Sequence, residues 1–247
     1  QCFQHAPHDL PICVPIATQL LHAAGVGFAL KYRAHQHGEP MQVAVASAGE
    51  GATSKGDFYE AINIAGVWKL PVVFVINNNQ WAISVPRKAQ TATQTIAQKA
   101  IAAGIPSLQV DGNDVVAVHW AVLDAIHRAR NGEGPALIEA LSYRLCDHTT
   151  ADDASRYRNA EELEHAWQWE PINRLETYLR AQDLWSDAKH QDMQRELAQI
   201  MEAALDRWES RAPEPATAIF DHLHAQLPEA YYEQYDQLRE EQSGARR

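Results

Sequence analysis

One apolar run constrains the fold of this chain more than any other feature. Residues 71–76, PVVFVI, are rich in β-branched side chains and show no polar alternation. Such a run is typical of a strand that is covered on both faces of a parallel sheet. It follows a segment, 57–68, with apolar residues at helical spacing, and that segment follows a short apolar run at 42–47. This order predicts two parallel strands joined by a crossover helix.

The alternation of strand and helix continues along the chain. Further helices are expected at 17–36, 92–103 and 115–130, the last capped by Asp114. Further strands are expected at 107–112 and 136–144. From about residue 160, charged amphipathic helices replace the strands, at 160–181, 186–209, 215–225 and 228–241.

These elements predict an α/β fold, with a mostly parallel sheet, helices on both of its faces and a helical C-terminal region. We expect an α/β domain over residues 1–160. Residues 161–247 are expected to form a helical extension packed on the same domain. Ligands on sheets of this kind bind beyond the carboxyl ends of the strands, so the turns at those ends are the first candidates for a site.

Charge and cysteine content exclude some classes of protein. The formal net charge of −11 over 247 residues argues against a nucleic-acid partner, which would require a basic face. Three scattered cysteines do not form a disulfide framework, which favours a reducing compartment. Residues 10–30 are apolar and near spanning length, but two prolines and mid-segment polar residues favour a helix buried in a core or interface over a membrane span. Gln1 is not a start residue, so we expect a processed chain or a fragment.

Two polar turns follow neighbouring predicted strands. The first is Gly49-Glu50-Gly51, and the second is the asparagine run 77–79. Glycines allow a close approach of the backbone to a ligand, and the following helix directs its N-terminal amides toward bound phosphate. Mg²⁺ takes oxygen ligands from carboxylate, amide, phosphate and water. Each turn alone is commonly a plain surface turn, but together they predict a site for a metal-bound diphosphate.

The segment GEGATSKGDFYEAINIAGVWKLPVVFVINNNQWAIS resembles the thiamin diphosphate motif, in which paired asparagines follow glycine, acid and glycine. More narrowly, it resembles the alpha subunit of the decarboxylating component of 2-oxo acid dehydrogenase complexes. The likeness continues through QKAIAAGIPSLQVDGNDVVAV, GEGPALIEALSYR and HTTADDASRYR, and so covers nearly the whole chain. The resemblance implies a thiamin diphosphate-binding fold with thiamin diphosphate and Mg²⁺ as cofactors.

The resemblance also implies a metal site. Glu50 and Asn79 would bind Mg²⁺ through their side chains, and Trp81 through its carbonyl oxygen. Many members of the family have Asp at the position of Glu50, whereas branched-chain members commonly have Glu.

The remaining contacts to the cofactor are implied in the same way. Gly49, Gly51 and Ala52 would line the diphosphate. The backbone at Ile16 would contact the aminopyrimidine ring. His148, which follows the Tyr-Arg pair of the last strand, would lie near the diphosphate and assist acyl transfer to a lipoyl group, a step that needs proton transfer.

A polar segment after His148 is expected to order over the cofactor. It carries two acidic and three basic or phenolic side chains, and Arg144 is their expected partner. The members of this set are Asp152, Asp153, Arg156, Tyr157 and Arg158. Taken without the resemblance, the same residues are a solvated surface loop.

The function that the resemblance implies is oxidative decarboxylation of a 2-oxo acid, with reductive transfer of the acyl group to a lipoyl group. Pyruvate is the expected substrate, and a branched-chain 2-oxo acid is the alternative. The partners would be a beta subunit, in an α₂β₂ heterotetramer, and a lipoyl-bearing acyltransferase, in the cytoplasm of a bacterium.

Two parts of the family's active site are not found in this sequence. One is a further Tyr-Arg pair, distinct from that of the last strand, which binds the diphosphate in the family. The other is the acid that activates the cofactor, which belongs to the beta subunit. The chain alone is therefore expected to be inactive. A non-catalytic assembly fragment and a transketolase-type ligase are the other interpretations, and the HTTADD loop argues against the second.

Overall fold

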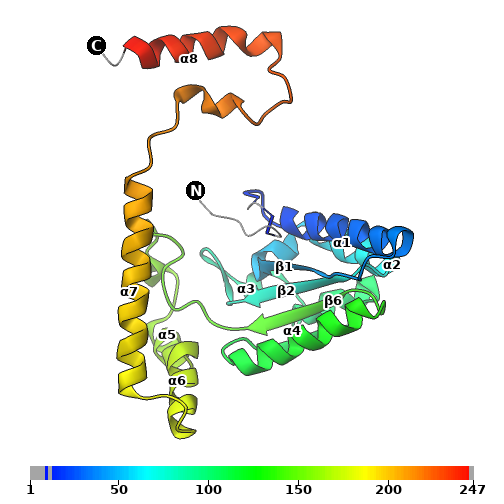
Figure 1. Ribbon diagram of the computed structural model, residues 1–247. Coiled ribbons are helices and arrows are strands. Elements are labelled where there is room, and N and C mark those ends of the chain that lie inside the picture. The colour runs from blue at the N-terminus through cyan, green and yellow to red at the C-terminus, as the bar shows by residue number, and fades with distance from the viewer. Residues whose placement is uncertain (1–8, 11–12, 245–247) are drawn as a thin grey trace. The chain divides into compact units, whose positions relative to one another are not determined.

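A computed structural model describes residues 9–10 and 13–244 (Figure 1). The chain divides into two compact units, Gln1–Leu184 and Trp185–Arg247. The first unit therefore continues beyond residue 160 and includes two further helices, α5 (Ala160–Trp167) and α6 (Pro171–Ala181). The assignment of residues 161–247 to an extension packed on the α/β domain stays a prediction.

The first unit is built on a four-stranded sheet in the order β1-β2-β6-β5, in which all neighbours are parallel. Its strands are β1 (Ala44–Gly49), β2 (Val72–Asn78), β5 (Ser107–Asp111) and β6 (Ala136–Leu141). The register pairs Gly49 with Asn77, and Asn78 with Leu141. Both polar turns therefore leave the sheet at the same edge.

Helices cover both faces of the sheet, as predicted from the sequence (Figure 1). On one face lie α1 (Thr18–His37), α2 (Gly56–Val67) and the 3₁₀ helix η2 (Ala97–Ala103). Their apolar side chains, among them Leu20 and Phe58, pack on Phe74 and Ile76 of β2. On the other face, α4 (Val115–Arg130) packs Ala125 against Val73 and Ile138. Alternate residues of β2 thus enter two separate cores, which explains why its sequence has no polar alternation.

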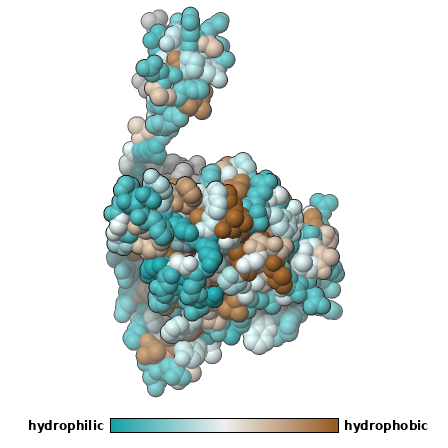
Figure 2. Space-filling view, turned by 90° about the vertical axis from the view of Figure 1, so that its right-hand side faces the viewer, coloured by the Kyte–Doolittle hydropathy of each residue, from teal (hydrophilic) through white to brown (hydrophobic). Residues whose placement is uncertain are grey.

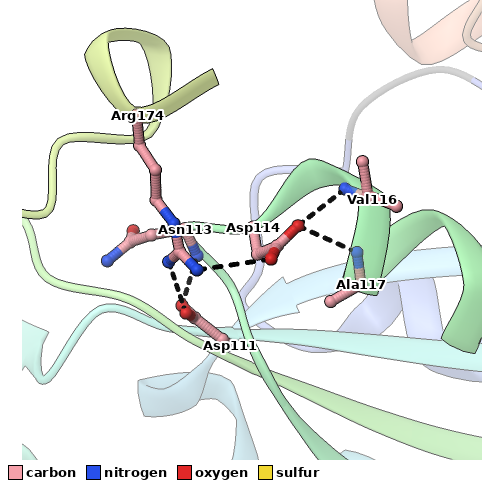
Figure 3. Close-up of polar contacts among 6 residues, drawn as sticks. All are labelled: Asp111, Asn113, Asp114, Val116, Ala117 and Arg174. Atoms are coloured by element: carbon pink, nitrogen blue, oxygen red, sulfur yellow. Dashed lines mark hydrogen bonds and ion pairs between the residues drawn. The ribbon is translucent and has the colours of Figure 1, made fainter. Parts of the chain in front are cut away.

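Asp114 begins α4 and also holds α6. Its Oδ1 accepts hydrogen bonds from the amides of Val116 and Ala117, at 3.0 and 3.1 Å, and caps the helix as predicted (Figure 3). Its other carboxylate oxygen lies 3.3 Å from Arg174 of α6, whose guanidinium is also 2.5 Å from Asp111 at the end of β5. These exposed ion pairs contribute little to stability. Their consequence is geometric, because they join α6 to the carboxyl edge of the sheet.

Several predicted elements differ from the structure. The helix expected at 215–225 is only the 3₁₀ helix η4 (Ala216–Phe220), and the one expected at 228–241 is the 3₁₀ helix η5 (Glu229–Tyr231) followed by α8 (Tyr232–Gly244). The helix expected at 92–103 is a 3₁₀ helix limited to residues 97–103. The helix expected at 160–181 is two helices, because Pro171 has no backbone N–H and begins a new helix that Glu170 caps. The strand expected at 136–144 ends at Leu141, after which the amides of Ser142 and Arg144 bond to the carbonyls of Asn78 and Asn79.

Shorter elements connect the sheet to its loops. They are the 3₁₀ helix η1 (Glu50–Ser54), the two-stranded hairpin β3 (Trp81–Ala82) and β4 (Val85–Pro86), helix α3 (Arg87–Gln90) and the 3₁₀ helix η3 (Ala154–Arg156). The second compact unit is helical throughout its regular elements. It contains α7 (Asp187–Glu209), η4 (Ala216–Phe220), η5 (Glu229–Tyr231) and α8 (Tyr232–Gly244). The ring centroid of Phe220 lies 6.0 Å from that of Tyr231 and 5.9 Å from that of Tyr235.

The apolar segment 10–30 falls mainly in α1, apart from residues 11–12, which lie outside the described range. Helix α1 buries Leu20, Ala23, Ala24 and Gly27 against the sheet and α2. Within the described residues, no helix has both the length and the apolarity needed to cross a membrane. On the face shown in Figure 2, hydrophobic side chains gather in small areas set among hydrophilic ones. Cys13 and Cys146 are free thiols, and Cys2 lies outside the described residues.

Candidate functional site

The two polar turns lie together at the carboxyl edge of the sheet. Glu50 directly follows β1 and opens η1, and Asn79 directly follows β2. The backbone of Asn79 interacts with the Glu50 carboxylate and lowers its pKa in part. The two turns thus lie close enough for the Asn79 backbone to interact with the Glu50 carboxylate, and the joint role of the two side chains stays a prediction.

Glu50 is a buried carboxylate with an unsatisfied oxygen. Its side chain belongs to a residue that is 2% exposed, and Oε1 has no hydrogen-bond partner. Burial raises the pKa of Glu50, and the Asn79 backbone, the Gln90 side chain and the charge of Arg144 lower it in part. Because a buried carboxylate that its neighbours compensate only in part is costly, such a group is typical of a site that binds a cation or a proton.

We expect the substitution Glu50→Gln to stabilise the cofactor-free protein at neutral pH. The folded-state pKa of Glu50 is raised, so burying the charge costs free energy above the ordinary carboxyl pKa. Below that pKa the side chain is protonated in both states, and the two proteins should be equally stable. As the pH rises through the ordinary value to the raised one, the variant should become more stable by about 1–3 kcal/mol. Thermal unfolding followed by circular dichroism between pH 4 and pH 8 measures this difference.

Glu133→Gln is the matched control for this experiment. Glu133 is half-exposed and pairs with Arg128 at 2.9 Å, so its neutralisation should not stabilise the protein at any pH. A Glu50→Gln variant that melts at the same temperature as the wild type at pH 8 would show that burial of the Glu50 charge has no cost in stability.

The glycines around Glu50 have two different roles. Gly49 has an ordinary extended conformation, with φ −74°, and an added Cβ would meet nothing within 4 Å. Glycine there leaves open space beside the turn, which suits the close approach of a ligand. At Gly51, by contrast, an added Cβ would lie 2.8 Å from Cβ of Ala82. Gly51 is therefore required by the packing of η1 on the β3–β4 hairpin. Ala52 is buried, at 4% exposed.

A side-chain turn at Asn79 sets the backbone of Trp81. Oδ1 of Asn79 accepts a hydrogen bond of 3.0 Å from the amide of Trp81. Gln80, between them, has a φ of 72°, in the left-handed region that non-glycine residues seldom occupy. An amide oxygen has two lone pairs, so Oδ1 of Asn79 is able to accept the hydrogen bond of this turn and bind a metal ion at the same time. The turn thus fixes the Asn79 amide oxygen and the Trp81 backbone relative to each other.

This donor set fits Mg²⁺. It contains one carboxylate with a free oxygen, one amide oxygen and one backbone carbonyl, while phosphate and water oxygens would complete six ligands. A cluster of three or more His, Cys, Asp or Glu side chains that could hold a metal is absent from the described part of the chain. A metal ion that requires several charged protein ligands therefore does not suit this site. A metal ion that takes part of its ligands from a bound diphosphate does suit it.

Arg144 joins the site to the loop that follows β6. Its Nη2 donates to the Ile83 carbonyl at 2.8 Å and to the Tyr157 hydroxyl at 2.7 Å. Tyr157 in turn donates to Asp152 at 2.5 Å, which lowers the pKa of Asp152. The Nε and Nη1 groups of Arg144 are buried without a partner. The guanidinium therefore orders the loop and keeps two donors that suit an anion.

The structure gives fewer contacts for the other predicted site residues, His148 and Ile16. His148 is exposed, and its backbone amide donates to Asp152 at 2.8 Å, which links it through Tyr157 to Arg144. Ile16 is 60% exposed and precedes Ala17, whose φ of 73° is unusual for alanine. Neither side chain has a described contact with Glu50 or Asn79, and their roles stay predictions.

Sequence reasoning gave no separate role to four buried polar residues in and behind the turns. They are Thr53, Asn78, Lys99 and Glu139, each at most 5% exposed. For Glu139 a signal was present, because a charged residue stands alone within the apolar strand ALIEAL. Lys99 gave no such signal, since it lies in an unremarkable helix-like stretch.

Comparison with protein-family profiles matches residues 5–217 to the family described as "Dehydrogenase E1 component". The chain belongs to this family. The resemblance stated from the GEG and NNN turns is thereby confirmed, as is the α/β fold that it implied.

Individual E1 relatives carry two different names. The chain is 42% identical over 231 residues to 3-methyl-2-oxobutanoate dehydrogenase subunit alpha of Mycobacterium tuberculosis, covering 94% of this chain and 62% of that protein. It is 41% identical over 229 residues to the pyruvate dehydrogenase E1 component subunit alpha of Staphylococcus epidermidis, covering 92% and 60%. The same protein of Staphylococcus aureus gives 41%, 92% and 60%. The chain thus spans about three fifths of the length of the curated relatives that it matches.

Proposed function

We propose that this chain supplies the alpha-subunit part of a thiamin diphosphate site in a 2-oxo acid dehydrogenase. The observation that carries the proposal is the buried Glu50 with its unpartnered oxygen, next to the turn that Asn79 makes with Trp81. The names of the E1 relatives support the same class of reaction.

Each residue of the site has a task in this proposal. Glu50, Asn79 and the Trp81 carbonyl hold Mg²⁺, and the open space at Gly49 admits the diphosphate. When bound, thiamin diphosphate supplies the stabilised carbanion that decarboxylation of a 2-oxo acid requires. Arg144 directs two buried donors toward negative charge and fixes the loop that carries His148. His148 handles a proton during acyl transfer to the lipoyl group.

Partners belong to the same proposal. We place the chain with a beta subunit in an α₂β₂ heterotetramer, with a lipoyl-bearing acyltransferase as the next component of the complex, in the bacterial cytoplasm. Pyruvate is the proposed substrate and a branched-chain 2-oxo acid the alternative. The two E1 relatives named for these substrates are almost equally similar, at 41% and 42% identity, so the comparison favours neither.

Calorimetric titration of the chain with thiamin diphosphate tests the proposal. The titration is made with and without Mg²⁺, and with and without a beta subunit of the family. We expect binding that requires Mg²⁺ and is strongest in the mixture with the beta subunit, because each subunit supplies part of the site.

The outcomes separate the competing interpretations. Binding that is independent of Mg²⁺ would contradict the roles of Glu50 and Asn79. Absence of binding in every mixture, with the chain folded and paired with the beta subunit, would support a non-catalytic assembly role instead.

A further inference from the structure

The proposed metal site has two halves, the turn that carries Glu50 and the turn that carries Asn79. Buried hydrogen bonds connect each half to one short element, η2. Glu50 and Asn79 follow the neighbouring strands β1 and β2, whose parallel ladder ends at the pair Gly49 and Asn77, so the turns themselves lie beyond the last ladder pair. Mg²⁺ requires oxygen ligands at about 2.0–2.1 Å in nearly octahedral geometry. The ladder fixes the two strand ends, and the spacing of the ligands beyond it needs further support from the residues behind the turns.

Lys99 of η2 anchors the Glu50 half. Its Nζ donates to the carbonyl of Thr53 at 2.8 Å and lies 3.0 Å from the Thr53 hydroxyl. That hydroxyl donates to the carbonyl of Glu50 itself at 2.7 Å. Thr53 is 0% exposed and Lys99 5% exposed, so the connection is shielded from water.

Burying the Lys99 ammonium has a cost that the surroundings reduce. Burial lowers the pKa of Lys99. The rings of Phe58 and Tyr59 lie 5.9 and 5.6 Å from Nζ, within the range of cation–π attraction. A buried ammonium group adds little net stability to a fold. We therefore attribute the burial of Lys99 to its two bonds with Thr53, which hold η1 in position.

Glu139 of β6 anchors the Asn79 half. Its Oε1 accepts a bond of 2.6 Å from Nδ2 of Asn78, and its Oε2 accepts one of 2.9 Å from the amide of Ala97, in the first turn of η2. The other end of the Asn78 side chain, Oδ1, accepts from the backbone amide and side chain of Gln80, at 3.2 and 2.8 Å. Asn79 thus lies between Asn78, which the fully buried Glu139 holds directly, and Gln80, which Asn78 holds in turn.

Helix η2 is itself fixed in place. At Gly66 of α2, an added Cβ would lie 2.7 Å from the carbonyl oxygen of Ala103, so the last turn of η2 packs against bare backbone. Ser107 donates to the carbonyl of Ala97 at 2.9 Å and holds the first turn. An element fixed at both ends can set a distance between the two groups that it holds.

We propose that Lys99 and Glu139 are positioning residues that act through η2 to fix the spacing of Glu50 and Asn79, and so set the affinity and the size selectivity of the metal site. This inference rests on the proposed cofactor function. Neither residue touches the metal; each acts through the turn that it holds.

The experiment measures the metal dependence of thiamin diphosphate binding in the complex with the beta subunit, for the wild type and the variants Lys99→Met and Glu139→Gln. Mg²⁺ and the larger Ca²⁺ are titrated separately. We expect the Mg²⁺ concentration for half-saturation to rise about 10–100-fold in each variant, as for other residues behind a metal ligand. The Ca²⁺ value should change much less, because Ca²⁺ accepts flexible geometry at 2.3–2.6 Å. Amide hydrogen exchange in the cofactor-free protein should speed up at residues 50–54 in Lys99→Met and at 78–81 in Glu139→Gln.

Lys31→Met is the matched control. Lys31 also donates to backbone carbonyls, those of Trp68 and Lys69, but at the far end of α2. Its removal should leave the ratio of Mg²⁺ to Ca²⁺ half-saturation unchanged. Should Lys99→Met fail to fold, Thr53→Val removes the hydroxyl link to Glu50 while keeping side-chain volume, and the same change in the ratio is expected.

The outcomes distinguish this inference from the proposed function. If the wild type shows no Mg²⁺-dependent binding, the proposed function fails and the positioning role fails with it. If the wild type binds but folded variants keep its ratio of Mg²⁺ to Ca²⁺ half-saturation, the positioning role alone is overturned, and Lys99 and Glu139 are structural.

Discussion

Replacement of Asn79 by alanine is expected to remove Mg²⁺-dependent binding of thiamin diphosphate while the chain still folds. The amide oxygen of Asn79 is one of the three protein ligands in the proposed metal site, and removal of a direct ligand should weaken the metal by more than the about 10–100-fold typical of residues behind a ligand. The variant also loses the 3.0 Å bond to the Trp81 amide, which frees the backbone that carries the carbonyl ligand. Calorimetry with Mg²⁺ measures the loss of binding. Circular dichroism measures folding, for which one lost hydrogen bond should cost about 0.5–1.5 kcal/mol.

Asn77→Ala is the control that separates the metal from the turn. Asn77 belongs to the same asparagine run, and its Oδ1 accepts a 2.8 Å bond from the hydroxyl of Ser142. Asn77 lies at the end of the same strand, β2, but is not one of the proposed metal ligands. Cofactor binding in Asn77→Ala should stay close to that of the wild type. Similar losses in both variants would show that the asparagine run matters for the shape of the strand end, and would refute the assignment of Asn79 as a ligand.

The sequence predicts the sheet because its signals are local. The run PVVFVI is recognisable as a doubly covered strand, and the structure shows β2 from Val72 to Asn78 with alternate residues in two cores. The helix expected at 57–68 is observed at 56–67 for the same reason. The break at Pro171 had an equally local cause, the missing amide of proline, although the charged pattern on either side suggested one continuous helix.

The buried anchors of the site could not be predicted in the same way. Lys99 contacts Thr53 across 46 positions, and Glu139 contacts Asn78 across 61. Their environments arise when β6 pairs with β2 and when η2 packs on α2, so no short window of sequence contains both partners. The ligands themselves lie in recognisable turns, whereas the residues that hold those turns are defined by the tertiary fold.

His148→Ala is expected to separate the two half-reactions of the proposed enzyme. Decarboxylation of the 2-oxo acid depends on the cofactor and the metal ligands, which His148 does not contact in the described structure. Acyl transfer to the lipoyl group needs a proton donor and acceptor, and the exposed imidazole of His148 is accessible to an incoming lipoyl arm. In the assembled complex, transfer to lipoyl should fall by about 10²–10⁴-fold. Decarboxylation, followed with an artificial electron acceptor, should fall far less.

Thr149→Ala is the control, because it alters the next exposed side chain and leaves the bond between the His148 amide and Asp152 in place. That bond, with those of Asp152 to Tyr157 and Tyr157 to Arg144, fixes the loop through backbone and side chains other than the imidazole. The alanine at position 148 should therefore keep the loop ordered, and protease cleavage within residues 147–158 should not increase. Equal losses in both half-reactions, with the loop still protected, would exclude an acyl-transfer role for His148 and place it among the groups that bind the cofactor.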